Sequence, residues 1–392
     1  MKVYEIGTGY TPIPATMGAA MEIVVEELTK AFQKLNIPVE IVDIKATVRK
    51  ENALPITEVW VPGCFTGTDV KLGIMHKLKR VVYSVCLAQK LKKILKSSQE
   101  KVVLHFHNQY NMFFFLKLVP EKLRKKAVTA YTVHSHVWHG KWAEIEKTIK
   151  ERYFQEVYSM EHADVVYVLN EKTLSNVVNY TAVYKENICQ IDNGVNTEIY
   201  KALEQKDKEK VQAGLQEKTV FIQVGSVCGR KNQLGSLELL MPFLQQDKNT
   251  VFLYAGGVIE PEYKEQIDRL AKDNGVSDQV QYWGELKPGA ELNAFYNLAE
   301  AMVFPSKAEG FSLVIIEAMA AGVPVIISDK LEFPLAGDCV QYKDEKSFCE
   351  KVKEEILNAD RRNVLSKHVA NTVTEHYGWV EIAKDYFGGW KQ

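Results

Sequence analysis

Two kinds of hydrophobic pattern alternate along the chain. Short runs rich in β-branched and aromatic residues predict strands, and longer stretches with apolar residues at every third or fourth position predict helices. The predicted strands are residues 3–6, 39–44, 101–106, 128–133, 164–169, 188–191, 219–224, 250–254, 279–283, 301–304 and 324–327. The predicted helices are residues 17–35, 71–96, 142–162, 171–180, 233–244, 261–274, 288–298 and 312–321. Strands and helices that alternate in this way form parallel sheets with helices on both faces.

The alternation runs through two successive series, which divide the chain into two parts. The first series ends with the strand at 188–191, the second begins with the strand at 219–224, and the polar, lysine-rich residues 201–218 lie between them. We therefore expect an α/β protein of two Rossmann-like domains, each with a doubly wound parallel sheet, and a hinge at residues 193–214. Open α/β sheets bind ligands beyond the carboxyl ends of their strands, so the loops there and the cleft between the domains are the expected site.

The composition is that of an ordinary globular protein. The 392 residues are 46% hydrophobic and 25% charged, and 49 basic against 50 acidic residues leave a formal charge of -1. So small a net charge gives no overall positive field and argues against nucleic acid as a partner. The six cysteines are widely spaced and contain no C-x-x-C pair, which predicts a reduced, cytoplasmic protein. No apolar run approaches the ~18 residues of a spanning helix, and Glu5 interrupts the N-terminal run that a signal peptide needs.

One region departs strongly from this charge balance. Between Lys71 and Lys126 the sequence holds fourteen Lys or Arg against two acidic residues, a local charge of +12. In the helix at 71–96 we interpret an apolar stripe as the face toward the sheet, with the lysines elsewhere on its surface. The stripe consists of Ile74, Leu78, Val81, Val82, Val85, Leu91, Ile94 and Leu95. This basic region, with the aromatic residues 113–115 beside it, fits either a solvated face or contact with an anionic membrane surface.

The most informative motif is FPSKAEGFSLVIIEAMAAGVPVII at residues 304–327. It predicts a strand, a polar loop, a helix that ends at Gly322, and another strand. Gly310 allows the backbone to approach a ligand closely, and Ser312 is placed to cap a helix whose free amides favour an anion. Glu309 and Glu317, eight positions apart, flank this helix start.

The motif resembles that of glycosyltransferase family 4, retaining enzymes of GT-B fold with an E-x7-E motif. The resemblance implies that Glu309 contacts the donor sugar together with Gly310 and Phe311, and that Glu317 binds the nucleotide ribose. It also implies that the donor diphosphate is held by the backbone of three residues, Phe311, Ser312 and Leu313.

Two further segments match the same family. In VGSVCGRKN at residues 224–232 the family's lysine is Lys231, but Ser226 stands where the family has arginine, so Arg230 is expected to supply that charge. The loop GTGYTPIPATMGAA at 7–20 resembles the family's glycine-rich loop, which places Gly18 at the donor diphosphate. A dinucleotide fingerprint fits less well, because Pro12 occupies the position of its third glycine.

Histidines end two of the predicted strands, as His105-x-His107 and His134-x-His136. Alternate residues of a strand share a face, so the four imidazoles could together bind a metal, although we expect none. The resemblance instead assigns His134 to a T-x-H strand end beside the donor sugar, and makes His134 and Glu309 the catalytic candidates. His107 and His136 would then line the cleft or pack.

Weaker matches extend the resemblance over almost the whole chain. Residues 193–196 resemble the family's segment that enters the interdomain linker, and Leu286 matches the residue whose main chain contacts the nucleobase. The resemblance thus implies an acceptor-binding domain at 1–193, a nucleotide-sugar-binding domain at 194–376, and a helix at 377–392 that crosses back to the first domain.

These expectations describe a cytoplasmic retaining glycosyltransferase. It would move a sugar from a nucleotide-diphosphate sugar to a carbohydrate acceptor, lipid-linked or free, in cell-surface polysaccharide or glycoconjugate synthesis. The sequence has no Asp-x-Asp, so we expect neither a metal nor another cofactor. A UDP-sugar 2-epimerase of the same architecture and a non-catalytic two-lobed binding protein stay as alternatives. Besides a purely cytoplasmic location, peripheral contact with the inner face of the plasma membrane through the basic region stays as an alternative.

Overall fold

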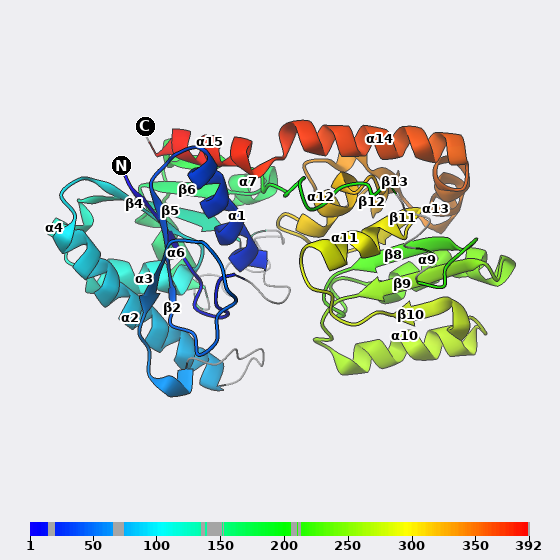
Figure 1. The fold of residues 1–392 in the computed structure, drawn as a ribbon, viewed down its shortest axis with the longest axis horizontal. Helices are drawn as coiled ribbons and strands as arrows, with labels where there is room; N and C mark the ends of the chain where they lie inside the picture. The colour runs from blue at the N-terminus through cyan, green and yellow to red at the C-terminus, as the bar shows by residue number, and fades with distance from the viewer. Residues whose placement is uncertain are drawn as a thin grey trace. The chain divides into compact units, whose positions relative to one another are not determined.

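The computed structural model describes residues 1–14, 20–65, 74–134, 138, 151, 153–204, 210 and 213–390. The chain forms two compact units (Figure 1). Unit 1 comprises Met1–Asn193 and Trp379–Gln392, and unit 2 comprises Gly194–Gly378. The first division falls between Asn193 and Gly194, and the C-terminal return begins at Trp379 rather than at Tyr377.

Unit 1 is built on a parallel sheet with seven strands among the described residues, in the order β3-β2-β1-β4-β5-β6-β7. The strands are β1 (Val3–Ile6), β2 (Val39–Ile44), β3 (Ile56–Val59), β4 (Val102–Phe106), β5 (Ala127–Val133), β6 (Val165–Val168) and β7 (Ile188–Gln190). The strand order reverses between β1 and β4, because later strands are added on the far side of β4. Such a reversal opens a crevice at the carboxyl ends of the two strands.

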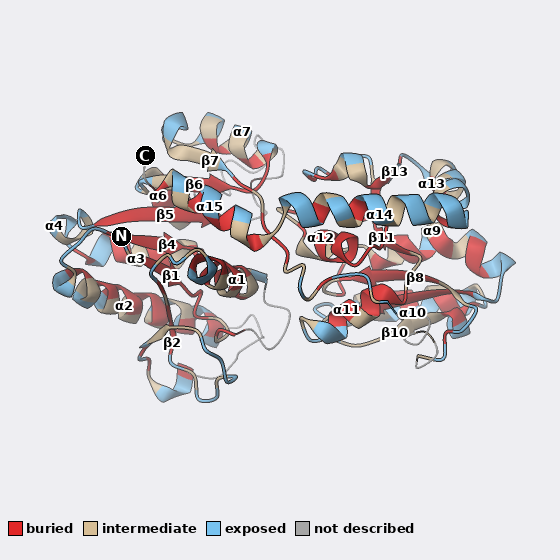
Figure 2. Cartoon of the chain, turned by 45° about the horizontal axis from the view of Figure 1, so that its top comes forward, coloured by how far each residue is buried: buried red, intermediate tan, exposed pale blue. Residues whose placement is uncertain are grey.

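Helices pack around this sheet and bury its residues. They are α1 (Ala20–Lys34), α2 (Ile74–Ser97), α3 (Gln109–Leu118), α4 (Glu121–Arg124), α6 (Phe154–Glu161), α7 (Glu171–Tyr180) and α15 (Trp379–Gly389). The predicted return of the C-terminus is seen in α15, where Tyr167 Oη donates to the carbonyl of Tyr386 at 2.9 Å. The strands β1, β2, β4, β5 and β6 are buried along most of their length, whereas α2 exposes one side to solvent (Figure 2).

The buried face of α2 differs from the predicted apolar stripe. Leu91 and Leu95 are buried as expected, but Ile74 is 84% and Leu78 46% exposed, and Val81 is exposed as well. The inner face at this end of the helix carries His76 and Lys79 instead, both buried. The stripe prediction was therefore wrong for the first two turns, because polar side chains occupy the inner positions there.

Unit 2 repeats the architecture with a parallel sheet in the order β10-β9-β8-β11-β12-β13. Its strands are β8 (Thr219–Val224), β9 (Thr250–Ala255), β10 (Val280–Tyr282), β11 (Ala301–Phe304), β12 (Val325–Ser328) and β13 (Val340–Tyr342). The helices are α9 (Gln233–Gln246), α10 (Pro261–Asp273), α11 (Ala290–Asn297), α12 (Leu313–Ala320), α13 (Glu345–Lys351) and α14 (Ala359–His376). The order reverses between β8 and β11, so the predicted pair of doubly wound sheets is confirmed.

Candidate functional site

The predicted motifs of unit 2 lie in the loops that follow β8 and β11. These strands are neighbours at the point where the strand order reverses, so their loops leave the same edge of the sheet side by side. The β8 loop also runs close to the end of β9, because a Cβ at Gly256 would lie 2.1 Å from the carbonyl oxygen of Gly225. Gly256 also has a φ of 143°, a backbone conformation that residues with a side chain rarely adopt, so both the close approach and the conformation require glycine here.

Glu309 is the centre of a group of polar side chains from both loops. Its Oε1 accepts hydrogen bonds from Lys231 Nζ at 2.8 Å, Arg230 Nη1 at 3.2 Å and Ser306 Oγ at 2.5 Å. Glu309 is 8% exposed, and burial lowers the pKa of Lys231 while the neighbouring Glu309 carboxylate opposes that effect. The structure thus brings Arg230, Lys231 and Glu309 together, and Ser306 is a partner that the sequence analysis missed.

Arg230 is the residue that the sequence analysis expects to supply the second cation. Its guanidinium donates to the carbonyl of Ala308 at 2.9 Å as well as to Glu309, so it bridges to the β11 loop. The residue at the family's arginine position, Ser226, offers its carbonyl to Gln233 at 3.0 Å. The two cations that converge on the loop are therefore Arg230 and Lys231.

The N-terminus of α12 presents an unpaired hydroxyl. Ser312 stands at the N-cap position, but its side chain makes no capping hydrogen bond. Its Oγ is buried and has no hydrogen-bond partner among the residues that the structure describes. Buried hydroxyls are normally paired, so this hydroxyl is available to donate a hydrogen bond to an anion at the helix start. Nearby, Phe311 packs against Phe333 with ring centroids 5.4 Å apart, and Gly310 and Leu313 are half-buried.

Glu317 lies on α12 and is 6% exposed. Its Oε2 accepts a hydrogen bond from Tyr296 Oη of α11 at 2.9 Å. Burial raises the pKa of the Glu317 carboxyl to about 7, although hydrogen bonds from Tyr296 and Tyr200 act in the opposite direction. These tyrosines were not predicted as its partners, since nothing in the motif points to Tyr296 of α11 or to Tyr200, which lies between β7 and β8.

Leu286 lines a cavity of about 360 Å³ within unit 2. The other lining residues are Ala213, Trp283, Glu291, Ala294, Phe295 and Leu298. The wall is mostly apolar, and the ring of Trp283 lies 5.2 Å from that of Phe295.

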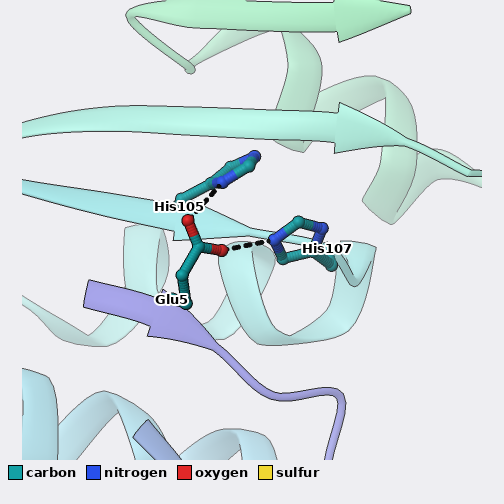
Figure 3. A group of neighbouring side chains, drawn as sticks. All are labelled: Glu5, His105 and His107. Atoms are coloured by element: carbon teal, nitrogen blue, oxygen red, sulfur yellow. Dashed lines mark hydrogen bonds and ion pairs between the residues drawn. The ribbon is translucent and has the colours of Figure 1, made fainter. Parts of the chain in front are cut away.

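Unit 1 has its own polar cluster at the reversal between β1 and β4. Figure 3 shows the Glu5 carboxylate of β1 between the imidazoles of His105 and His107. Glu5 Oε1 lies 3.0 Å from His105 Nδ1, and Oε2 lies 2.7 Å from His107 Nε2. His107 Nδ1 in turn lies 3.0 Å from His134 Nε2, at the end of β5. Sequence reasoning missed Glu5 as a partner of the histidines, although a charged residue inside a buried four-residue strand was a signal.

Glu5, His105 and His107 lie close enough together to be candidate ligands of one metal ion. The distances between their ligand atoms are those of hydrogen bonds, and the carboxylate already accepts from both imidazoles. A metal ion would have to replace these bonds within a fully buried cluster. The cluster therefore fits a hydrogen-bond network better than a metal centre.

The loop after β1 is held by buried polar contacts. Tyr83 Oη and Asn111 Nδ2 donate to the carbonyl of Gly7 at 3.1 and 3.0 Å, and Thr8 donates to Glu22. Burial raises the pKa of Glu22 to about 7. Two predicted positions, Gly18 and His136, lie outside the described residues.

No helix in the described part of the chain combines the length and apolar character needed to cross a membrane.

Comparison with known proteins agrees with the two-unit division. A family model described as "Glycosyltransferase Family 4" matches residues 21–199, and one described as "Glycosyl transferases group 1" matches residues 205–367. The solved structure of Anabaena HepE in complex with UDP and glucose shares the fold, with a TM-score of 0.71 over 99% of this chain and 98% of that one, at 14% identity.

Two curated relatives are mannosyltransferases by name. The serotype-specific mannosyltransferase WbdA of Escherichia coli is 29% identical over 198 residues, which is 48% of this chain. The O-antigen chain mannosyltransferase RfbU of Salmonella typhimurium is 26% identical over 69% of this chain and 67% of its own. The chain spans only 23% of the length of WbdA.

Fold and motifs together define a two-lobed α/β protein of the GT-B type, as predicted. The chain thus combines a family 4 glycosyltransferase region at residues 21–199 with a group 1 glycosyl transferase region at residues 205–367.

Proposed function

We propose that the protein is a retaining glycosyltransferase that moves a sugar from a nucleotide-diphosphate sugar to a hydroxyl of a carbohydrate acceptor. The acceptor belongs to a cell-surface polysaccharide or glycoconjugate. The observation that carries the proposal is the convergence of Arg230, Lys231 and Glu309 beside the unpaired Ser312 hydroxyl of α12. Cations and free helix amides at one sheet edge suit a diphosphate, whose charge grows as the glycosidic bond breaks.

Each unit has a distinct part in this proposal. In unit 2, Arg230, Lys231 and the backbone of Phe311, Ser312 and Leu313 hold the diphosphate, with Gly18 of unit 1 as a further proposed contact. Glu317 binds the ribose, and the main chain at Leu286 contacts the base. Glu309, with Gly310 and Phe311, meets the donor sugar.

The proposed reaction is a substitution on one face of the sugar. The departing diphosphate helps to deprotonate the incoming hydroxyl, while Glu309 and His134 stabilise an oxocarbenium-like sugar. In this scheme the side chains of Arg230 and Lys231 supply the positive charge that stabilises the leaving diphosphate, so no metal is required.

A donor screen tests the proposal. Release of nucleoside diphosphate is measured with GDP-, UDP- and dTDP-sugars, with and without carbohydrate acceptors, and GDP-mannose comes first because WbdA and RfbU are named mannosyltransferases. We expect acceptor-dependent release that persists in excess EDTA. Conversion of the donor alone to its C2 epimer would support the epimerase instead, and tight donor binding without turnover would support a binding protein. Loss of transfer in EDTA with recovery in Mn²⁺ would overturn the metal-free scheme.

We further propose that unit 1 contacts an anionic membrane surface peripherally. The exposed apolar residues Ile74, Met75 and Leu78 begin α2, and Lys77, Lys93 and Lys96 of the same helix are also exposed. Apolar side chains beside a cationic surface suit lipid headgroups and a lipid-linked acceptor.

A further inference from the structure

A hydrogen-bonded chain connects Glu5 with His134. Glu5 Oε2 lies 2.7 Å from His107 Nε2, and His107 Nδ1 lies 3.0 Å from His134 Nε2. Glu5 is fully buried and His107 is 2% exposed, so the inner members of the chain are shielded from water. A neutral imidazole has one donor and one acceptor nitrogen, and its partners decide which is which.

The charge of Glu5 sets the direction of the chain. Burial by itself raises the pKa of the Glu5 carboxyl, but its interactions with His105 and His107 outweigh burial and lower the pKa to about 2. An ionised carboxylate only accepts hydrogen bonds, so Nε2 of His107 must donate. Burial lowers the pKa of His107 to about 4, so at neutral pH its Nδ1 carries a lone pair.

The same logic then fixes His134. Because His107 Nδ1 accepts, His134 Nε2 must donate to it. Burial and the neighbouring histidines hold the pKa of His134 well below its ordinary value, so this imidazole carries a single proton. With that proton on Nε2, the other ring nitrogen, Nδ1, is left with a lone pair.

A second branch keeps the Glu5 carboxylate in place. His105 Nδ1 lies 3.0 Å from Glu5 Oε1, and His105 Nε2 lies 2.7 Å from Thr132 Oγ1. The ring of His105 also contacts Tyr386 and Trp390, at centroid distances of 5.0 and 5.5 Å. Both carboxylate oxygens are therefore engaged, and Glu5 cannot turn away from His107 without losing the other bond.

We propose that Glu5 is a positioning residue that acts through His107 to hold His134 as the Nε2–H tautomer. Nδ1 of His134 then accepts a hydrogen bond from a hydroxyl of the bound sugar. This inference rests on the proposed function, which supplies the sugar. It makes His134 a neutral acceptor for a hydroxyl rather than a cation for the diphosphate.

The tautomers can be read without any substrate. Long-range ¹H–¹⁵N NMR of protein labelled at the histidine rings shows which nitrogen of each imidazole is protonated, and His107→Gln and His134→Gln variants assign the signals. We expect protons on Nε2 of both His107 and His134 at pH 7. A proton on Nδ1 of wild-type His134 would overturn the proposal.

Removal of the Glu5 carboxylate should reverse the direction in which His107 and His134 donate their hydrogen bond. In Glu5→Leu, a proton kept on His107 Nε2 would be a buried donor without an acceptor, so it should move to Nδ1 and be donated to His134. His134 should then appear as the Nδ1–H tautomer. In Glu5→Gln, which is closer in shape and serves if the leucine variant does not fold, the amide can donate to either imidazole and both tautomers of His134 should appear. Unchanged Nε2–H in the folded variants would overturn the proposal.

A matched control is Glu156→Gln. Glu156 is another buried carboxylate of unit 1, and it accepts a hydrogen bond from Tyr131 Oη at 3.0 Å. Its replacement should leave the His134 tautomer as in wild type. A change there would show that any buried charge of unit 1 moves the histidines, and would remove the specific role of Glu5.

Kinetics separate this inference from the proposed function. With a donor found by the screen, Glu5→Leu should lower kcat by about tenfold to a thousandfold, since a histidine in the wrong tautomer cannot accept the hydrogen bond of the sugar hydroxyl. Affinity for the nucleoside diphosphate should stay within about twofold of wild type. The expected tautomers without any transfer would contradict the proposed function alone. Transfer with a kcat that Glu5→Leu leaves unchanged would contradict the relay alone.

Discussion

At the scale of single residues, Glu309 partly compensates the charge of the two cations that are proposed to bind the diphosphate. Its carboxylate pairs with Lys231 at 2.8 Å and Arg230 at 3.2 Å, and Lys231 has a side chain only 11% exposed. A bound diphosphate would compete with Glu309 for these cations, which leaves the carboxylate free to face the sugar. Glu309 and Glu317 should therefore differ in what their loss affects.

The two glutamates can be separated by binding and turnover. Glu309→Gln should depress turnover while affinity for the free nucleoside diphosphate is kept or increased, because a competing carboxylate is gone. Glu317→Ala should weaken that affinity by about 1–3 kcal/mol, since ribose hydroxyls lose their acceptor. Calorimetric titration and initial rates measure both effects. Equal loss of nucleotide affinity in the two variants would show that the roles are divided wrongly.

Glu317 also predicts a pH dependence of stability. Its pKa is about 7 in the folded protein against an ordinary value of 4.5, so the folded state binds more protons between these values. The free energy of unfolding should therefore fall as pH rises through this window, by about 3 kcal/mol for this group. Glu317→Gln has no carboxyl that titrates at this position. Its free energy of unfolding, measured by chemical denaturation, should therefore rise relative to that of wild type by about 3 kcal/mol between pH 4.5 and pH 8. Glu22 titrates in both proteins and cancels in the difference. Parallel pH curves would contradict the prediction.

At the scale of elements, the sequence predicts the buried strands and the edge strands β7 and β10, but it misses the edge strands β3 and β13 and the helix α14. The strand β3 (Ile56–Val59) includes the exposed Glu58, and β13 (Val340–Tyr342) has three residues, so neither shows a clear run. The helix α14 (Ala359–His376) buries only Val369 and Val373, which is too few for a visible stripe. In the first two turns of α2 the polar His76 and Lys79 take inner positions, and the hydrophobic pattern therefore indicates the wrong face there.

In the candidate site, too, some features follow from local sequence and others depend on how the strands are ordered. Glu309, Glu317, Arg230 and Lys231 stand in motifs that are readable locally. Their contacts depend on the order of strands in the sheet, which places the β8 loop beside the β11 loop. Glu5 pairs with His105 one hundred positions away, because β1 lies next to β4. No local pattern contains that information.

The start of α12 gives a prediction about a helix cap. Ser312→Ala should leave stability within about 0.5 kcal/mol of wild type, because the hydroxyl makes no capping bond to lose. If the hydroxyl binds phosphate, nucleoside diphosphate affinity should fall by about 1.5–3 kcal/mol. The control is Asp344→Ala, which removes the capping box of α13 and should cost about 1 kcal/mol of stability without any change in affinity. Loss of stability in Ser312→Ala with unchanged affinity would mean that the serine is only a cap.

At the scale of the whole molecule, both units place their polar clusters where the strand order reverses. Glu5, His105 and His107 lie at the reversal between β1 and β4, and Lys231 and Glu309 at that between β8 and β11. In each unit the polar cluster therefore lies where open α/β sheets bind their ligands. The units differ in surface charge, since the stretch from Lys71 to Lys126 carries +12 in a protein of net charge -1. That asymmetry is the basis of the proposed membrane contact.

If the basic stretch and the apolar start of α2 contact a membrane, binding to liposomes should rise with anionic lipid content and fall with salt. Each surface Lys or Arg contributes about 1 kcal/mol through a screened field. A charge-reversal variant at Lys92, Lys93, Lys125 and Lys126 should therefore bind less and be less active on a lipid-linked acceptor, with equal activity on a water-soluble analogue. Reversal at four lysines of unit 2, Lys272, Lys343, Lys346 and Lys353, controls for total charge, since all four are exposed. Ile74→Ser with Leu78→Ser tests the apolar contribution and should weaken binding even at high salt. If the wild type does not bind anionic liposomes at low salt, the basic region is only a solvated face, and the transferase proposal is unaffected.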